Sequence, residues 1–76
     1  MSLNEKRSRF EKIAGNRVQY ILDKLDLLGN CSNRSNYEFS EEDVKKMFTT
    51  IKSRVKQVEA LYKEELDKQN KNKFKF

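Results

Sequence analysis

The sequence predicts an all-α fold, in which two long amphipathic helices form an antiparallel hairpin. Apolar residues recur at alternating intervals of four and three in both halves of the chain, a polar segment interrupts this pattern, and proline is absent. Alternating intervals of four and three are typical of helices that pack side by side. We therefore expect helices over about residues 4–28 and 41–68.

The first expected helix carries the first apolar ladder: Ala14, Val18, Ile21, Leu25 and Leu28. Ser2–Glu5 and Ser8–Glu11 both fit a capping box, so the helix start is open between them. Gly15 lies inside the ladder, which indicates either close packing or a weak point. Gly29 and Asn30 predict the helix end, with glycine in the left-handed conformation.

The second expected helix has the clearest start in the chain. Ser40 is the predicted N-cap, with Asp43 three residues later, and Phe39 and Val44 fit a hydrophobic staple. Acidic residues at positions 41–43 suit the positive end of a helix. The second ladder follows, and residues 70–76 are expected to form a frayed basic tail. The members of the second ladder are Val44, Phe48, Ile51, Val55, Val58 and Tyr62.

The composition favours an oligomer built from one domain, residues 1–76. The chain has 76 residues, of which 36% are hydrophobic and 38% charged, and its single cysteine cannot form an internal disulfide. Such small chains often need partners to complete a core. Met47, Leu61 and Leu66 widen the apolar face beyond one narrow seam, which favours a bundle. We expect a homodimeric four-helix bundle, with a monomer or a trimer as alternatives. The expected oligomer core contains Val18, Ile21, Leu25, Val44, Phe48, Ile51, Val55 and Val58.

The net charge of +5 is unevenly distributed along the chain. Residues 1–17 hold five bases and two acids, residues 18–46 hold four bases and six acids, and residues 47–76 hold eight bases and four acids. In an antiparallel hairpin the two basic segments would meet at the open end, where they could bind nucleic-acid phosphates. The alternative is a solvated basic surface. The candidate nucleic-acid contacts are Lys6, Arg7, Arg9, Lys12, Lys71 and Lys73.

The polar segment between the helices has two interpretations. As a recognition loop on a rigid scaffold, it would bind a protein partner through Asn33, Arg34, Asn36 and Tyr37. As a structural loop, its Asn and Ser side chains would instead satisfy their own backbone and fix the turn.

A family resemblance is carried by the same segment, residues 29–37, which reads Gly-Asn-Cys-Ser-Asn-Arg-Ser-Asn-Tyr. It continues through residues 41–48 and includes Arg9-Phe10 and Asn16-Arg17-Val18, so it covers most of residues 9–62. The segment resembles a group of small proteins from Gram-positive bacteria, often found on phages, plasmids and integrated mobile elements. The resemblance implies an intracellular bacterial or phage origin and assigns no functional residue.

The composition argues against an enzyme. The chain has no histidine to act as a base for Cys31, so we expect no catalytic, cofactor-binding or metal-binding residue, and no cofactor. An apolar run of about 18 residues, the length of a membrane span, is also missing, as is a signal-peptide core. We therefore expect a cytoplasmic protein without a membrane partner. The favoured function is a protein-interaction module, and the alternative is a small nucleic-acid-binding accessory protein.

Overall fold

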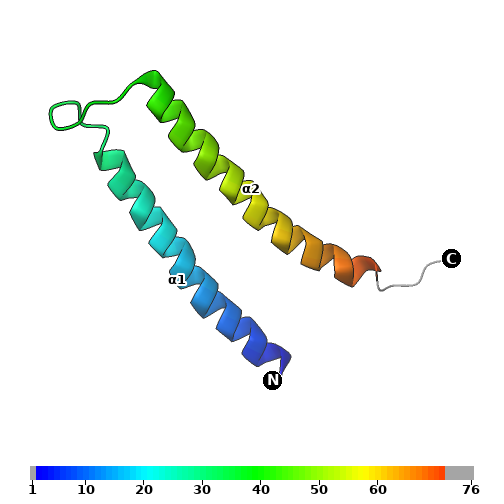
Figure 1. Ribbon diagram of the computed structural model, residues 1–76. Coiled ribbons are helices and arrows are strands. Elements are labelled where there is room, and N and C mark those ends of the chain that lie inside the picture. The colour runs from blue at the N-terminus through cyan, green and yellow to red at the C-terminus, as the bar shows by residue number, and fades with distance from the viewer. Residues whose placement is uncertain (1, 72–76) are drawn as a thin grey trace. The chain divides into compact units, whose positions relative to one another are not determined.

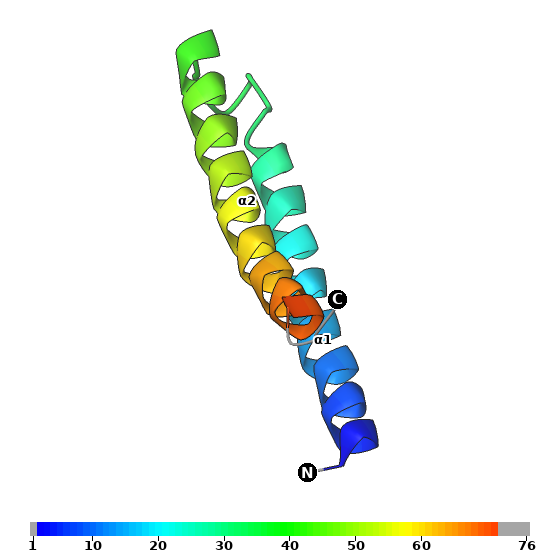
Figure 2. The same cartoon turned by 90° about the vertical axis from the view of Figure 1, so that its right-hand side faces the viewer.

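The computed structural model describes residues 2–71, with side chains for residues 2–69. The described chain contains two helices and no strand: α1 spans Leu3–Asn30 and α2 spans Glu41–Lys71 (Figure 1). This confirms the all-α class. The helices are 28 and 31 residues long, and each runs without a break (Figure 2).

The start of α1 lies at the first of the two predicted positions, with Ser2 as the N-cap. The Ser2 hydroxyl accepts a hydrogen bond from the Glu5 backbone N–H at 3.2 Å, and the Ser2 carbonyl accepts one from the Lys6 N–H at 3.1 Å. Ser2 itself has extended backbone angles, as an N-cap requires. Ser8 therefore lies inside the helix rather than at its start.

The predicted left-handed glycine cap of α1 is wrong, although the helix ends at Asn30, within two residues of the expected position. Neither glycine in the chain has a positive φ, and the helix continues through Gly29 to Asn30. The cap is Cys31, in the right-handed helical region, whose N–H donates to the Leu28 carbonyl at 3.0 Å. The Ser32 N–H likewise donates to the Gly29 carbonyl at 3.1 Å. Because these tight i to i−3 bonds already satisfy terminal carbonyls, no left-handed residue is needed.

The predicted start of α2 is confirmed. The Ser40 backbone N–H donates to Asp43 Oδ2 at 2.9 Å, and the Asp43 N–H donates to Ser40 Oγ at 3.2 Å. Phe39 and Val44 are both partly buried, as the hydrophobic staple requires.

The end of α2 lies at Lys71, later than the expected Lys68. The sequence has no glycine after Gly29 and no proline, so it contains no residue that would stop α2 earlier. The predicted frayed tail therefore begins inside α2, and its residues 72–76 lie outside the described part of the chain.

The connection between the helices, residues 31–40, contains a turn that begins at Asn33. The Asn33 carbonyl accepts hydrogen bonds from the N–H groups of Asn36 at 3.1 Å and Tyr37 at 3.0 Å. Its side-chain Oδ1 accepts a third from the Ser35 N–H at 3.0 Å. This last contact is an Asx turn, in which the side chain satisfies the local backbone.

The chain divides into two units, Met1–Glu38 and Phe39–Phe76, each built around one helix. Among residues 2–69, no side chain is buried. The partly buried residues in that range are Ala14, Leu28, Phe39, Val44 and Ile51. Of these, all but Phe39 belong to the predicted apolar ladders. The prediction of a single domain over residues 1–76 stays a prediction.

Candidate interaction surfaces

The apolar ladder of α1 forms a straight stripe on one side of the helix, here named the α1 seam: Ala14, Val18, Ile21, Leu25 and Leu28. At 3.6 residues per turn, these positions fall within about 80° of the helix circumference. Val18 and Ile21 remain 54% and 56% exposed. The α1 seam is therefore an apolar surface that is accessible to a partner.

An ion pair occupies the heptad positions that precede the α1 seam. Arg7 Nε donates to Glu11 Oε1 at 2.8 Å, and the Arg7 guanidinium lies 5.9 Å from the centre of the Phe10 ring. The spacing from Arg7 through Glu11 to Ala14 repeats the four-three interval of the seam. The regular four-three ladder of apolar residues thus begins at Ala14, and Phe10 adds an exposed aromatic ring in the preceding turn. Because Glu11 offsets its charge, Arg7 is a weaker candidate for a phosphate contact than an unpaired base.

The apolar ladder of α2 forms a longer stripe of the same kind, here named the α2 seam: Val44, Phe48, Ile51, Val55, Val58 and Tyr62. Its positions also fall within about 80° of the circumference. Val55 is 51% exposed, although Val44 and Ile51 are partly buried. Met47 and Leu61 widen the apolar surface on one side of the seam, Leu66 continues the seam one turn past Tyr62, and all three are exposed.

A second apolar line runs along α1 at seven-residue intervals: Ile13, Tyr20 and Leu27. It lies about 120° around the helix from the centre of the α1 seam. Its side chains are exposed, and the Lys24 ammonium lies 5.0 Å from the centre of the Tyr20 ring. This cation–π contact covers part of the aromatic face. The α1 helix therefore presents apolar residues on more than one side.

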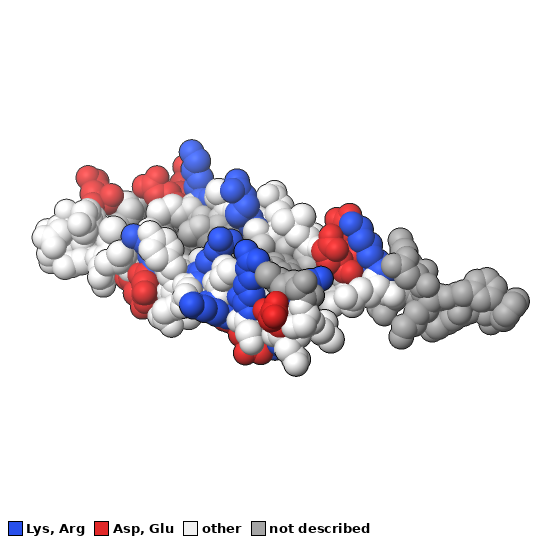
Figure 3. Space-filling model, turned by 90° about the horizontal axis from the view of Figure 1, so that it is seen from below, with Lys and Arg blue, Asp and Glu red and all other residues white. Residues whose placement is uncertain are grey.

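The predicted nucleic-acid contacts occupy the two ends of the chain. Lys6, Arg9 and Lys12 lie in the first three turns of α1, and all three are exposed. The side chain of Lys71 and all of Lys73 lie outside the described part. On the face seen in Figure 3, basic and acidic side chains are interspersed among uncharged ones. The meeting of the two basic ends stays a prediction.

The candidate protein-binding loop contains one residue with a structural role. Asn33 fixes the turn through its side chain and its carbonyl, as the structural interpretation of the loop expects. Tyr37 is 53% exposed, and Arg34 and Asn36 are also exposed. These three side chains are accessible to a partner, and their role in binding stays a prediction.

Side chains suited to catalysis or metal binding are sparse. The Cys31 thiol is exposed and lies 3.8 Å from the Leu27 carbonyl oxygen. Within the described residues, no group of three or more His, Cys, Asp or Glu could hold a metal ion. No helix in that part of the chain is long and apolar enough to cross a membrane.

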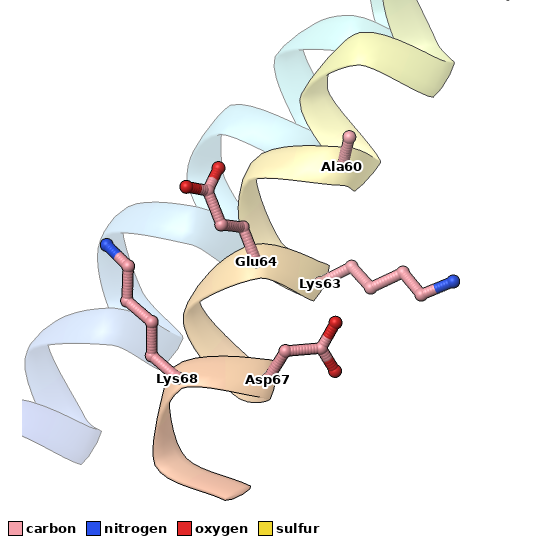
Figure 4. Close-up of a pocket in the computed structure, with 5 residues that line it drawn as sticks. All are labelled: Ala60, Lys63, Glu64, Asp67 and Lys68. Carbon is pink, nitrogen blue, oxygen red and sulfur yellow. The ribbon is translucent and has the colours of Figure 1, made fainter. Parts of the chain in front are cut away.

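A shallow depression on α2 is lined by residues of a single helix. Figure 4 shows Lys63 and Asp67 extending to one side of the ribbon, and Glu64 and Lys68 to the other. Ala60 is the remaining lining residue. Ligand pockets usually have largely apolar, concave walls. The depression on α2 is open, and four of its five lining residues are charged.

A row of lysines on α2 went unrecognised in the sequence as a separate feature. Lys45, Lys52, Lys56 and Lys63 are separated by intervals of seven, four and seven residues. These intervals place the four side chains on one side of the helix. The sequence already contained this signal, but it becomes apparent only when the charges are placed on a helix and not counted by segment.

No protein family, curated protein or solved structure significantly matches this chain.

Proposed function

We propose that this chain is a non-enzymatic helical interaction protein that assembles with a second copy of itself through the α1 and α2 seams. The assembly is a four-helix bundle, with two helices from each copy. One observation carries the proposal: each helix has a continuous apolar seam, and no side chain among residues 2–69 is buried.

The energetics favour burial of these seams. Burying a Val, Leu, Ile or Phe side chain contributes about 1.5–3 kcal/mol. Because these side chains are already about half-buried, the eight expected core residues of one chain contribute roughly half of the full value, about 6–12 kcal/mol. Association costs about 4–15 kcal/mol in lost translational and rotational freedom, before side-chain ordering. Since each copy contributes its own core, the dimer has enough apolar area to offset this cost.

The width of the apolar surface favours four helices over two. A helix that packs against one partner needs only a narrow seam, whereas a bundle helix contacts two neighbours. Met47 and Leu61 lie on one side of the α2 seam and Leu66 lies at its other edge. In the proposed bundle, Met47 and Leu61 contact the second neighbour.

The connection between the helices is the proposed site for a further protein partner. Arg34 and Tyr37 are residue types that often anchor interfaces, and both are exposed. The Asx turn at Asn33 holds the backbone between them in a defined shape. We propose that this loop binds its partner in the cytoplasm of a bacterium, in keeping with the intracellular origin that the family resemblance implies.

The alternative function is nucleic-acid binding by the basic open end of the hairpin. Its support is the net charge of +5 and the exposure of Lys6, Arg9 and Lys12. Because Arg7 is paired with Glu11, this set is weaker than its sequence suggests. The interaction proposal ranks first because it accounts for both apolar seams.

Solution mass tests the proposed assembly. Sedimentation equilibrium over about 1–100 µM protein is expected to give twice the chain mass at every concentration. Circular dichroism on the same samples is expected to give high helicity. A helical monomer throughout this range would contradict self-assembly. A trimer would retain the proposal of assembly but overturn the four-helix arrangement.

A further inference from the structure

The lysine row of α2 consists of Lys45, Lys52, Lys56 and Lys63. On a helix with 3.6 residues per turn, the four positions fall within about 40° of the circumference. The row covers 18 residues from first to last, which corresponds to about 27 Å along the axis. The four cations therefore form a nearly straight line on one rigid element.

The row lysines are exposed and lack acidic partners. Among residues 2–69, the ion pairs within 4.0 Å are Arg7 with Glu11 and Lys68 with Glu65, so no row lysine takes part in one. The nearest acids in the pattern are Glu41 and Glu59, toward the α2 seam, and Asp67, beyond Lys63 (Figure 4). The row is consequently a line of available positive charge interrupted by few acids.

The chemistry of the row favours a phosphate backbone over a protein partner. Protein interfaces have apolar centres and are depleted in lysine, and no apolar side chain lies between the first and last members within the sector of the row. A lysine ammonium is a point charge on a flexible stem, which contacts phosphate without a fixed geometry. Such contacts provide affinity and carry no sequence information.

We propose that the lysine row is a nucleic-acid-binding surface that contacts the phosphate backbone without reading base sequence. The row lies about 100° around α2 from the centre of the α2 seam, so it stays accessible when the seam is packed. This inference goes beyond the proposed assembly and does not depend on it. It also differs from binding by the basic ends, since no row lysine belongs to that set.

Salt dependence provides the first test. A fluorescently labelled 20-base-pair DNA duplex is titrated with the protein, and anisotropy gives the affinity at salt concentrations from 50 to 200 mM. Four lysine–phosphate contacts per chain predict a slope of log affinity against log salt of about −3.6. That slope corresponds to a loss of about 150-fold in affinity over this range. The absence of binding at 50 mM salt would overturn the proposal.

Matched double variants locate the binding surface. Lys52→Gln/Lys56→Gln removes two row lysines, and the expected slope falls to about −1.8 per chain. Lys46→Gln/Arg54→Gln removes the same charge from other sides of α2, and the expected slope stays near that of the unchanged protein. Glutamine is a good helix former, and circular dichroism checks that both variants remain helical. Equal losses in both variants would mean diffuse attraction and would overturn the row as the site.

Two further probes distinguish nucleic acid from other polyanions. Polyglutamate of matched charge and vesicles containing a third anionic lipid are titrated under the same conditions. The proposal predicts that the duplex binds at least tenfold more tightly than either probe, and that only duplex binding depends on the row lysines. Row-dependent binding to vesicles or to polyglutamate that exceeds duplex binding would identify a lipid or acidic protein partner and overturn the nucleic-acid assignment.

Discussion

Ser40 and Asp43 exchange two hydrogen bonds at the start of α2. The Ser40 N–H donates to Asp43 Oδ2 at 2.9 Å, and the Asp43 N–H donates to Ser40 Oγ at 3.2 Å. The usual capping box has glutamate or glutamine at the second position. In α2 the shorter aspartate makes the same reciprocal contact. Both bonds form within four residues, so the start of α2 is fixed by local chemistry.

Replacement of Ser40 by alanine is expected to destabilise the protein. The variant leaves the Asp43 N–H without its side-chain acceptor, and loss of an N-cap typically lowers the free energy of unfolding by about 1 kcal/mol. Urea unfolding followed by circular dichroism measures this difference. Ser53→Ala is the matched control, because Ser53 lies inside α2 and alanine favours helix there. Equal effects of the two variants would contradict a capping role for Ser40.

The capping box predicts a loss of stability in acid. The hydrogen bond from the Ser40 N–H, followed by one with its hydroxyl and by the charge of Lys46, lowers the pKa of Asp43. The pKa of Asp43 is lower in the folded protein than in the unfolded chain. The ionised cap therefore contributes its full stabilisation of the fold above the unfolded pKa, about 4. It is then lost as the pH falls through the folded value.

Comparison of variants isolates this titration from that of the other carboxylates. Asp43→Asn is expected to lose less stability than the unchanged protein between pH 5 and pH 2, as followed by thermal melting. Asp26→Asn is the control, since Asp26 lies inside α1 and not at a helix start. If Asp43→Asn and the unchanged protein had parallel pH profiles, the capping box would not be the titrating element.

The α2 seam is expected to be essential for assembly. Val55→Asp places a carboxylate in the middle of the seam, where burial of an unpaired charge costs several kcal/mol. Sedimentation is expected to give a monomer, and circular dichroism a large loss of helicity. Ser53→Asp introduces the same charge on the opposite side of α2, and we expect it to retain the assembly. A Val55→Asp variant with unchanged mass would exclude the seam from the interface.

The sequence predicted the parts of the fold that depend on local chemistry. The reciprocal bonds of Ser40 and Asp43 need only residues that are close in the chain, and the seams need only a regular interval. The end of α1 could not be predicted in the same way. Gly29 permits a left-handed cap without requiring one. The tight bond from Cys31 to Leu28 ends the helix in its place.

The sequence predicted some features of the candidate surfaces and missed others. Counting charges by segment placed Arg7 among the available bases, although its spacing from Glu11 also allowed the ion pair found in the structure. The lysine row was missed because its charges were counted by segment and were not placed around the helix that the sequence already predicted over residues 41–68. The loop offered two roles from the same residues, and hydrogen-bond geometry assigned Asn33 to the turn.

Asn33 and Tyr37 are expected to have separable roles in the connection. Asn33→Ala removes the acceptor for the Ser35 N–H and is expected to increase amide hydrogen exchange at residues 35–37. Tyr37→Ala keeps that acceptor, so exchange in the turn is expected to change little. Hydrogen exchange measured by mass spectrometry compares the two variants. Greater exchange in Tyr37→Ala than in Asn33→Ala would place the structural role on the aromatic side chain instead.

Gly15→Ala is expected to stabilise the protein. A Cβ atom built at Gly15 meets nothing within 4 Å, and the residue has ordinary helical geometry. Alanine inside a helix is more favourable than glycine by about 1 kcal/mol, so the free energy of unfolding should rise by that amount in urea titration. Gly29→Ala, near the end of α1, is the comparison and should have a smaller effect. If Gly15→Ala instead weakened self-association in sedimentation, the missing side chain would be needed for close approach of a second copy. The glycine would then mark a point on the dimer interface.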